Sequence, residues 1–443
     1  MRFAPHTDRD VEEMLATCGL SSLDDLFGHL PPGVTLDREL AIPEGLSEME
    51  LIAEMRCLAG RNRGAGDLIC FAGGGAYDHY VPSVVWALAG RSELYTSYTP
   101  YQPELSQGVL QALFEYQSMI CELTGLEVSN ASLYDGATAV VEAVSMARAA
   151  TRRSTVLVSE GVDRRYVEIL GTYGKGAGYE LEFIPAPGGW TTQPVMGDEV
   201  AAVIVQHPNA FGNLEPARAI FEAAHATGAR AIEIFDPLSL GLVASPQELG
   251  ADIAVAEGQV LGNHLYYGGP YLGIIAARMQ DVRRMPGRIV GETTDALGRT
   301  GYVLTLQARE QHIRREKATS NICTNQTLMA VAATVYLAWL GPHGLKELGR
   351  QCLAKTRYAG ERLSSLPGVS LMFPEAEPFK EFVVVTDREP TIVQRRLLEA
   401  GFLVGPEVNW PQGMKPGMLV SITEQRTREE IDRLVKAFEE AAS

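Results

Sequence analysis

The stretch "ARAIEIFDP", residues 229–237, decides the fold of this chain. It is a short, almost continuously apolar run that ends in Asp236. Runs of the same kind stand on both sides of it: "STVLVS" (154–159), "ELEFIP" (180–185), "VAAVIVQHPN" (200–209) and "ADIAVAEG" (251–258). Their alternation with helical patterns predicts an α/β fold with a mainly parallel sheet covered on both faces. Such sheets bind ligands at the carboxyl ends of their strands, where Asp236 stands.

Helical periodicity and capping signals mark the segments between and around these strands. Ser47 with Glu50 three residues later forms the capping-box pattern of a helix start, and Gly228 ends the pattern "ARAIFEAAHATG". Apolar spacing predicts a short amphipathic start over residues 7–27 and helices over 47–61, 109–123, 217–228 and 328–340.

The character of the sequence changes after about residue 310. There "EFVVVTDREPTIVQRRLLEAGFLVG" (381–405) and "GMLVSITEQRTREEIDRLVKAFEEA" (417–441) each read as a strand, a helix and their connections. We therefore expect an N-terminal helical arm (1–60), a large α/β domain (61–310), and linking helices with a small C-terminal α+β domain (311–443).

Composition limits the classes of function. The chain has 443 residues, 46% hydrophobic and 21% charged, and a formal net charge of −17, which argues against nucleic-acid or anionic-membrane binding. A local basic patch at Arg314, Arg315 and Lys317 is a possible docking point. Six scattered cysteines without a C-x-x-C pair argue against a metal site or a disulfide framework. No leader pattern or uninterrupted membrane-spanning run is evident, so we expect a cytoplasmic protein.

The segment after Asp236 lacks a residue that its pattern leads one to expect. An aspartate ending such a strand can pair with the ring nitrogen of pyridoxal phosphate, and a lysine about two dozen residues later usually holds that cofactor covalently. Here residues 254–273 read "AVAEGQVLGNHLYYGGPYLG" and residues 236–273 contain no lysine. The seven lysines are Lys175, Lys317, Lys346, Lys355, Lys380, Lys415 and Lys436. We expect a scaffold that cannot run this chemistry alone and that supplies something to a partner.

Three tyrosines at intervals of three occupy "YTSYTPYQPE", residues 95–104. Pro100 and Pro103 exclude an ordinary helix over this segment. One interpretation is an aromatic packing strip. The other is a rigid loop that presents phenol donors to an anionic substrate, and the residues alone leave both open.

Two further segments carry polar groups for which structural roles are favoured. In "NASLYDGATAVVEA" (130–143), Gly136 opens an apolar helix whose amides suit an anion, but Asp135 would repel a phosphate and is better explained as the helix N-cap. Asn263 and His264 stand beside the turn "GGP" (268–270), where hydrogen-bonded structural residues are commoner than catalysts.

Taken together, these segments resemble the glycine decarboxylase (P protein) family of the glycine cleavage system, in the form of its separately encoded alpha subunit. The matching stretches run from end to end. They are "SSLDDLF" (21–27), "GGGAYDHYVPSVV" (73–85), residues 95–143, "HPNAFG" (207–212), "DPLSLGL" (236–242), residues 258–273, residues 299–330 with "IRREKATSNICT", and "GPHGL" (341–345).

The resemblance implies a pyridoxal-phosphate-dependent transferase fold of the aspartate-aminotransferase type. It implies a homologous beta subunit that carries the lysine and pyridoxal phosphate, and an α2β2 heterotetramer. In this family glycine loses CO2, and its aminomethyl group passes to the lipoyl arm of H protein. By comparison with a lysine-bearing half, Gln259 or a near neighbour stands where the lysine would be.

The resemblance also assigns site residues. It implies that a loop reaches the partner's cofactor pocket, with Glu104 as proton handler or loop anchor; its residues are Tyr95, Tyr98, Tyr101, Gln102 and Glu104. Gly73 to His79 would form a second pocket wall, and Asp236 would keep only a structural role. Two alternatives stay open: a free-standing pyridoxal lyase or aminotransferase using Lys317, and a non-catalytic scaffold that stabilises the beta subunit or docks H protein.

Overall fold

The computed structural model describes residues 4–36, 38–64, 66–95, 99–411 and 413–443. It divides into two compact units, Met1–Arg63 and Gly64–Ser443. The first unit contains α1 (Asp8–Cys18), the short helix η1 (Asp24–Phe27) and α2 (Glu48–Ala59). The predicted capping box of α2 is confirmed, because Ser47 accepts from the amide of Glu50 and the Glu50 carboxylate accepts from Ser47. None of the residues described in this unit is buried.

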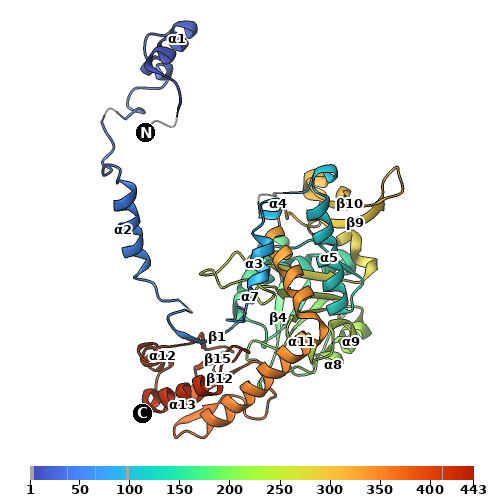
Figure 1. The fold of residues 1–443 in the computed structure, drawn as a ribbon. Coiled ribbons are helices and arrows are strands. Elements are labelled where there is room, and N and C mark those ends of the chain that lie inside the picture. The colour runs from blue at the N-terminus through green and yellow to red at the C-terminus, as the bar shows by residue number, and fades with distance from the viewer. Residues whose placement is uncertain (1–3, 37, 65, 96–98, 412) are drawn as a thin grey trace. The chain divides into compact units, whose positions relative to one another are not determined.

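A seven-stranded sheet forms the centre of the second unit (Figure 1). Its order is β2 (Val128–Ser129), β8 (Gly273–Ala277), β7 (Ile253–Glu257), β6 (Arg230–Phe235), β5 (Val200–His207), β3 (Thr155–Ser159) and β4 (Glu180–Ile184). The five predicted strands, β3 to β7, run parallel, which confirms the mainly parallel sheet. The structure adds β8, antiparallel to β7, and β2, antiparallel to β8.

Helices cover both faces of this sheet because its strands are apolar on both sides. The covering helices include α3 (Ser83–Ala89), α5 (Gln107–Thr124), α6 (Gly136–Thr151), α7 (Arg164–Ala177), α8 (Ala217–Thr227) and α11 (Thr327–Ser364). Alternation along β5 shows the division: Ala202 and Ile204 belong to the core under α6 and α7, whereas Val203 and Val205 pack under α8. On that second side, α5 and α11 cover Ala254 and Ile274.

Helix α11 is long and apolar enough to cross a membrane by length and composition alone, which the sequence analysis did not anticipate. Half of its apolar window is buried inside the protein, and Gly341 breaks its helical backbone with a φ of 59°. Its N-terminal half packs in the core that also contains α5. Burial against the sheet is a sufficient reason for this hydropathy.

A smaller layer follows, with a four-stranded antiparallel sheet in the order β11 (Val369–Leu371), β12 (Glu381–Thr386), β15 (Gly417–Ser421) and β14 (Glu407–Val408). Helices α12 (Pro390–Glu399) and α13 (Arg428–Ala442) pack on it. The early strand β1 (Ile69–Ala72) pairs in parallel with β13 (Phe402–Gly405). The segment after β1 therefore starts beside the C-terminal layer and leads from there to the large sheet.

The remaining elements are short. A hairpin of β9 (Ile289–Thr294) and β10 (Thr300–Thr305) projects from the large domain (Figure 1). The others are α4 (Ser92–Tyr95), η2 (Pro103–Leu105), η3 (Ser239–Gly241), α9 (Pro246–Leu249), η4 (Met279–Arg284), η5 (Gln307–Arg309), α10 (Gln311–Arg314) and η6 (Arg315–Lys317).

Candidate active site

A pocket lies at the carboxyl ends of β5, β6 and β7, where the rule for parallel sheets places it. The strands contribute Gln206 from β5, Asp236 directly after β6, and Glu257 at the end of β7. Other parts of the chain contribute Tyr77, Lys380 and Glu381. The predicted position of Asp236 at the pocket is confirmed.

Lys380, which comes from the C-terminal layer, lies directly against Asp236. Its Nζ atom is 2.6 Å from Oδ2 of Asp236 and 3.5 Å from the ring centre of Tyr77, and the residue is only 2% exposed. Lys380 is one of the seven lysines of the chain, but its sequence position gives no reason to place it beside Asp236; Lys317 is the alternative that the sequence favours. The one local signal is a lysine directly before the buried strand β12. The carboxylate that would pair with a cofactor ring nitrogen is occupied by the chain's own ammonium group.

Gln259 is the residue suggested for the position of the missing lysine, and both hydrogens and the oxygen of its amide are engaged. Nε2 donates to the carbonyl oxygens of Tyr77 (3.1 Å) and Asn263 (2.8 Å), while Oε1 accepts from the amide of Tyr77 (2.9 Å). Three hydrogen bonds satisfy most of what a primary amide can make. Gln259 therefore fastens the segment around Tyr77 to the loop after β7.

The N-terminus of α6 is likewise filled by carboxylates of this chain. The amide of Gly136 donates to Oε2 of Glu257 (3.0 Å), and the amide of Thr138 donates to Oδ1 of Asp135 (2.8 Å). The predicted N-cap role of Asp135 is confirmed, with a full capping box. A helix N-terminus attracts anions through such amides, and here the anions are already present.

The residues of this pocket therefore do not fit pyridoxal phosphate. Lys380 pairs with Asp236, the carboxylate that would meet a ring nitrogen. Residues 236–273 contain no lysine, and carboxylates accept hydrogen bonds from the α6 amides that would bind a phosphate. Burial raises the pKa values of both Glu257 and Glu381 to about 7, although hydrogen bonds to each oppose the shift. The pocket is an acid-lined internal contact surface that holds one cation.

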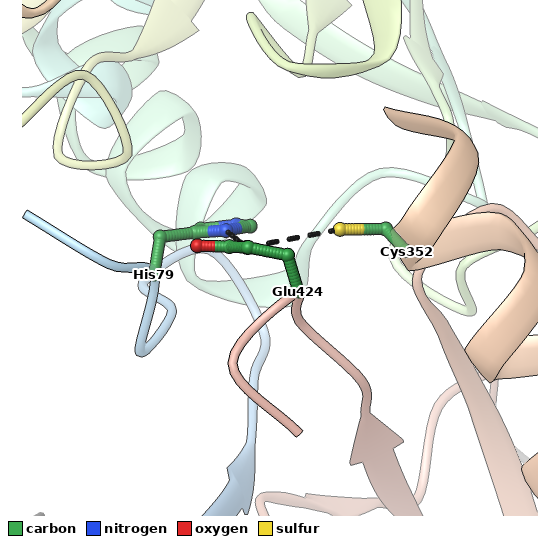
Figure 2. Close-up of side chains that lie close together, drawn as sticks. All are labelled: His79, Cys352 and Glu424. Atoms are coloured by element: carbon green, nitrogen blue, oxygen red, sulfur yellow. Dashed lines mark hydrogen bonds and ion pairs between the residues drawn. The ribbon is translucent and has the colours of Figure 1, made fainter. Parts of the chain in front are cut away.

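A series of polar contacts extends from Lys380 away from the pocket, and Figure 2 shows its far end, where His79 meets Glu424. Nζ of Lys380 is 3.4 Å from Nε2 of His79, and Nδ1 of His79 is 2.6 Å from Oε2 of Glu424. Burial alone would raise the pKa of Glu424, but attraction to His79 and hydrogen bonds from His79 and Tyr80 outweigh it and lower that pKa to about 2. These contacts connect the segment after β1, the C-terminal layer and the pocket.

His79, Glu424 and Cys352 offer three metal-ligand atoms within 4.8 Å of one another (Figure 2). The separation of 2.6 Å between Nδ1 of His79 and Oε2 of Glu424 is shorter than the roughly 3.3 Å between two ligands of one tetrahedral zinc ion. Burial raises the pKa of the Cys352 thiol to about 12, and Lys380 and Lys355 lie beside the group. Hydrogen bonding explains this geometry better than metal coordination.

The predicted tyrosine loop lies on the surface of this chain. Tyr95 ends α4 and is 64% exposed, and Tyr101 is 55% exposed. Gln102 and Glu104 are also exposed, and Tyr98 lies outside the described residues. Pro100 is buried and anchors the segment, while Pro103 begins η2. Within the described part of the loop, the tyrosines are not packed as an internal aromatic strip.

One buried cation stands behind the loop, and sequence reasoning did not single it out. Nη2 of Arg288 donates to the hydroxyl oxygen of Tyr101 over 2.7 Å, and the guanidinium carbon lies 5.2 Å from the ring centre of Tyr101. Arg288 directly precedes β9 and is 4% exposed. The contact joins the loop to the base of the hairpin.

The other predicted residues have structural surroundings. Gly75 and Tyr77, within the proposed second wall, line this chain's own pocket, and the Gly74 amide donates to Glu381. Asn263 is buried, and His264 stacks on Trp86 with ring centres 6.3 Å apart. Lys317 is exposed on η6, so Lys380 rather than Lys317 is the lysine next to Asp236.

Known proteins with similar sequences identify the family of this chain. The family model described as Glycine cleavage system P-protein matches residues 1–438. The chain is 52% identical to a "Probable glycine dehydrogenase (decarboxylating) subunit 1" of Moorella thermoacetica, over 99% of both chains. It is 50% identical to a protein of the same name in Desulforamulus reducens, over 98% of both.

Among solved structures, a crystal structure of glycine decarboxylase (P-protein) of the glycine cleavage system in inhibitor-bound form has a TM-score of 0.92 and 45% identity, covering 100% of both chains. A glutamate decarboxylase from Lactobacillus brevis shares only the fold, at a TM-score of 0.69 and 12% identity over 92% of this chain and 96% of the other. The predicted pyridoxal-phosphate-dependent transferase fold is confirmed. The chain belongs to the glycine cleavage system P-protein family.

Proposed function

We propose that this chain is the alpha subunit of a glycine dehydrogenase (decarboxylating) and that it acts only with a homologous beta subunit. The pair releases CO2 from glycine and transfers the aminomethyl group to the lipoyl arm of H protein. The curated relatives, named as subunit 1, support this assignment. The observation that carries it is the contrast between a pocket filled by Lys380 and an exposed tyrosine loop.

In this proposal the beta subunit holds pyridoxal phosphate, which when bound supplies an electron sink for decarboxylation. The loop of this chain completes the partner's site, and its residues are Tyr95, Tyr98, Tyr101, Gln102 and Glu104. Because the Tyr101 oxygen accepts a hydrogen bond from Arg288, its own proton is free for another acceptor. Tyr101 then donates to a charged substrate group, and Glu104 moves a proton or anchors the loop.

The same proposal covers assembly and location. Two α and two β chains form an α2β2 heterotetramer in the cytoplasm. Glycine is the substrate, and H protein carries the lipoyl arm that accepts the aminomethyl group. The formal charge of −17 supports the absence of nucleic-acid and membrane partners. We also propose three parts of the chain: an N-terminal arm that ends at residue 60, a large domain that ends at residue 310, and linking helices with a small C-terminal domain after it.

Reconstitution tests this function. Exchange of labelled bicarbonate into glycine is measured for this chain alone, for the beta subunit alone and for their mixture. We expect exchange only in the mixture, which should elute from gel filtration as one defined complex. Full exchange by the beta subunit alone would refute the proposal, and a complex that forms without gaining activity would leave this chain as a scaffold.

A further inference from the structure

Arg288 holds a buried positive charge for which the described part of the chain provides no carboxylate. Two arginines are buried there, Arg288 at 4% and Arg426 at 7% exposure. Arg426 lies 3.1 Å from Asp78 and 4.0 Å from Glu430. Among the described residues Arg288 has no ion pair, and its Nε–H is buried without a hydrogen-bond acceptor. Buried charges are normally paired, so this one calls for an anion from outside the described part of the chain.

The surroundings of Arg288 connect it to the proposed shared site. Among the described residues, the side-chain hydrogen bond of Arg288 goes to Tyr101, whose ring also lies over the guanidinium group. Tyr101 is more than half exposed and belongs to the loop proposed to enter the partner's pocket. A group that meets the Tyr101 hydroxyl is therefore next to the guanidinium as well.

We infer that Arg288, together with Tyr101, binds the carboxylate of glycine in the active site completed with the beta subunit. This inference rests on the proposed function. A guanidinium group presents N–H donors in a planar fork that matches a carboxylate, and the free Nε–H supplies one arm of that fork. A single arginine with one phenol matches a singly charged carboxylate better than the more highly charged phosphate of a cofactor.

The discriminating experiment compares two amines on the complex of this chain with the beta subunit loaded with pyridoxal phosphate. Glycine carries the carboxylate and methylamine does not. Binding of each amine is followed by the change in cofactor absorbance. Arg288→Gln should weaken glycine binding by roughly 30-fold or more, because removing one partner of a buried charge pair has an effect of that size. Methylamine binding should stay unchanged.

Arg288→Lys should restore part of the glycine affinity, because it keeps the charge and loses the fork. It also keeps the test valid if Arg288→Gln fails to fold. Arg153→Lys is the matched control, since Arg153 lies just before β3 and donates to the carbonyls of Val200, at the start of β5, and Thr227. That control should leave the binding of both amines unchanged.

Three results would overturn the inference. Equal weakening for both amines with loss of cofactor on gel filtration would assign Arg288 to the phosphate. No change for either amine in a folded complex would reduce Arg288 to packing under Tyr101. If the beta subunit alone binds glycine as tightly as the native complex, the proposed function fails together with the inference. If glycine binding needs the complex but the Arg288 variants bind glycine normally, only the inference about Arg288 fails.

Discussion

The pocket around Asp236 and the loop around Tyr101 differ in how their polar groups are satisfied. In the pocket, groups of the same chain engage the Asp236 carboxylate and the first amide of α6, through Lys380 and Glu257. At the loop, Tyr101 is exposed and the Arg288 guanidinium behind it has no carboxylate partner among the described residues. In this molecule, unsatisfied polar groups mark a binding site better than position in a familiar fold does.

This difference follows from the cost of burying charge. A buried ion pair is tolerable when both partners are present, and an isolated buried charge is not. Without a bound cofactor, Asp236 has no protonated ring nitrogen beside it, and Lys380 supplies a cation from the C-terminal layer. Arg288 has no anionic partner among the described residues, which suits a subunit that works at an interface.

The largest expected effect concerns the filled pocket. Lys380→Met leaves Asp236 without its cation and should lower the free energy of unfolding by about 3–5 kcal/mol. Adding Asp236→Asn should recover much of that loss, because no buried charge then stays unpaired. Urea unfolding of both variants measures this, with exposed Lys346→Met as control. Equal stability of the Lys380→Met variant and the native chain would contradict the claim that Lys380 compensates the charge of Asp236.

The next effect concerns the loop. If a tyrosine donates to a group that gains charge in the transition state, removing its hydroxyl should cost about 2.7–4 kcal/mol, or roughly a hundredfold or more in turnover. Tyr95→Phe, Tyr98→Phe and Tyr101→Phe are assayed for glycine decarboxylation in the assembled complex. Tyr173→Phe, an exposed tyrosine on α7, is the control. Full activity in all three variants would favour the scaffold interpretation.

A smaller effect is the pH dependence of stability. Burial raises the pKa of Glu381 from 4.5 to about 7, so between these values the folded chain holds a proton that the unfolded chain has released. Stability should therefore fall as pH rises from about 4.5 to 7 and level off above that window. Glu381→Gln should flatten this slope in melting temperatures measured from pH 5 to 8, whereas Glu115→Gln, on the exposed face of α5, should not. An unchanged slope would contradict the assigned burial of that carboxyl.

Local features of the fold could be predicted from the sequence because local patterns determine them. The five parallel strands follow from apolar runs, and the caps at Ser47 and Asp135 follow from side chains three residues from their partners. Strand β8 was not predicted, because its short apolar run directly follows a glycine-rich turn.

The site was predictable only in part. Asp236 and the exposed tyrosines stand in recognisable motifs. The contacts of Lys380, His79 and Glu424 join segments hundreds of residues apart, and no local pattern announces them. Arg288 follows a Pro-Gly pair without any periodic signal, so only its burial and its missing partner reveal it.

Cofactor binding by the purified chain tests the central claim most directly. The chain alone is incubated with pyridoxal phosphate, treated with borohydride to fix any covalent link, and weighed by intact mass spectrometry, with the beta subunit treated identically. We predict that the beta subunit gains one pyridoxyl group and that this chain gains none, because Lys380 is engaged by Asp236 and residues 236–273 contain no lysine. One pyridoxyl group per molecule of this chain, mapped to Lys380 or any other single lysine, would contradict the account.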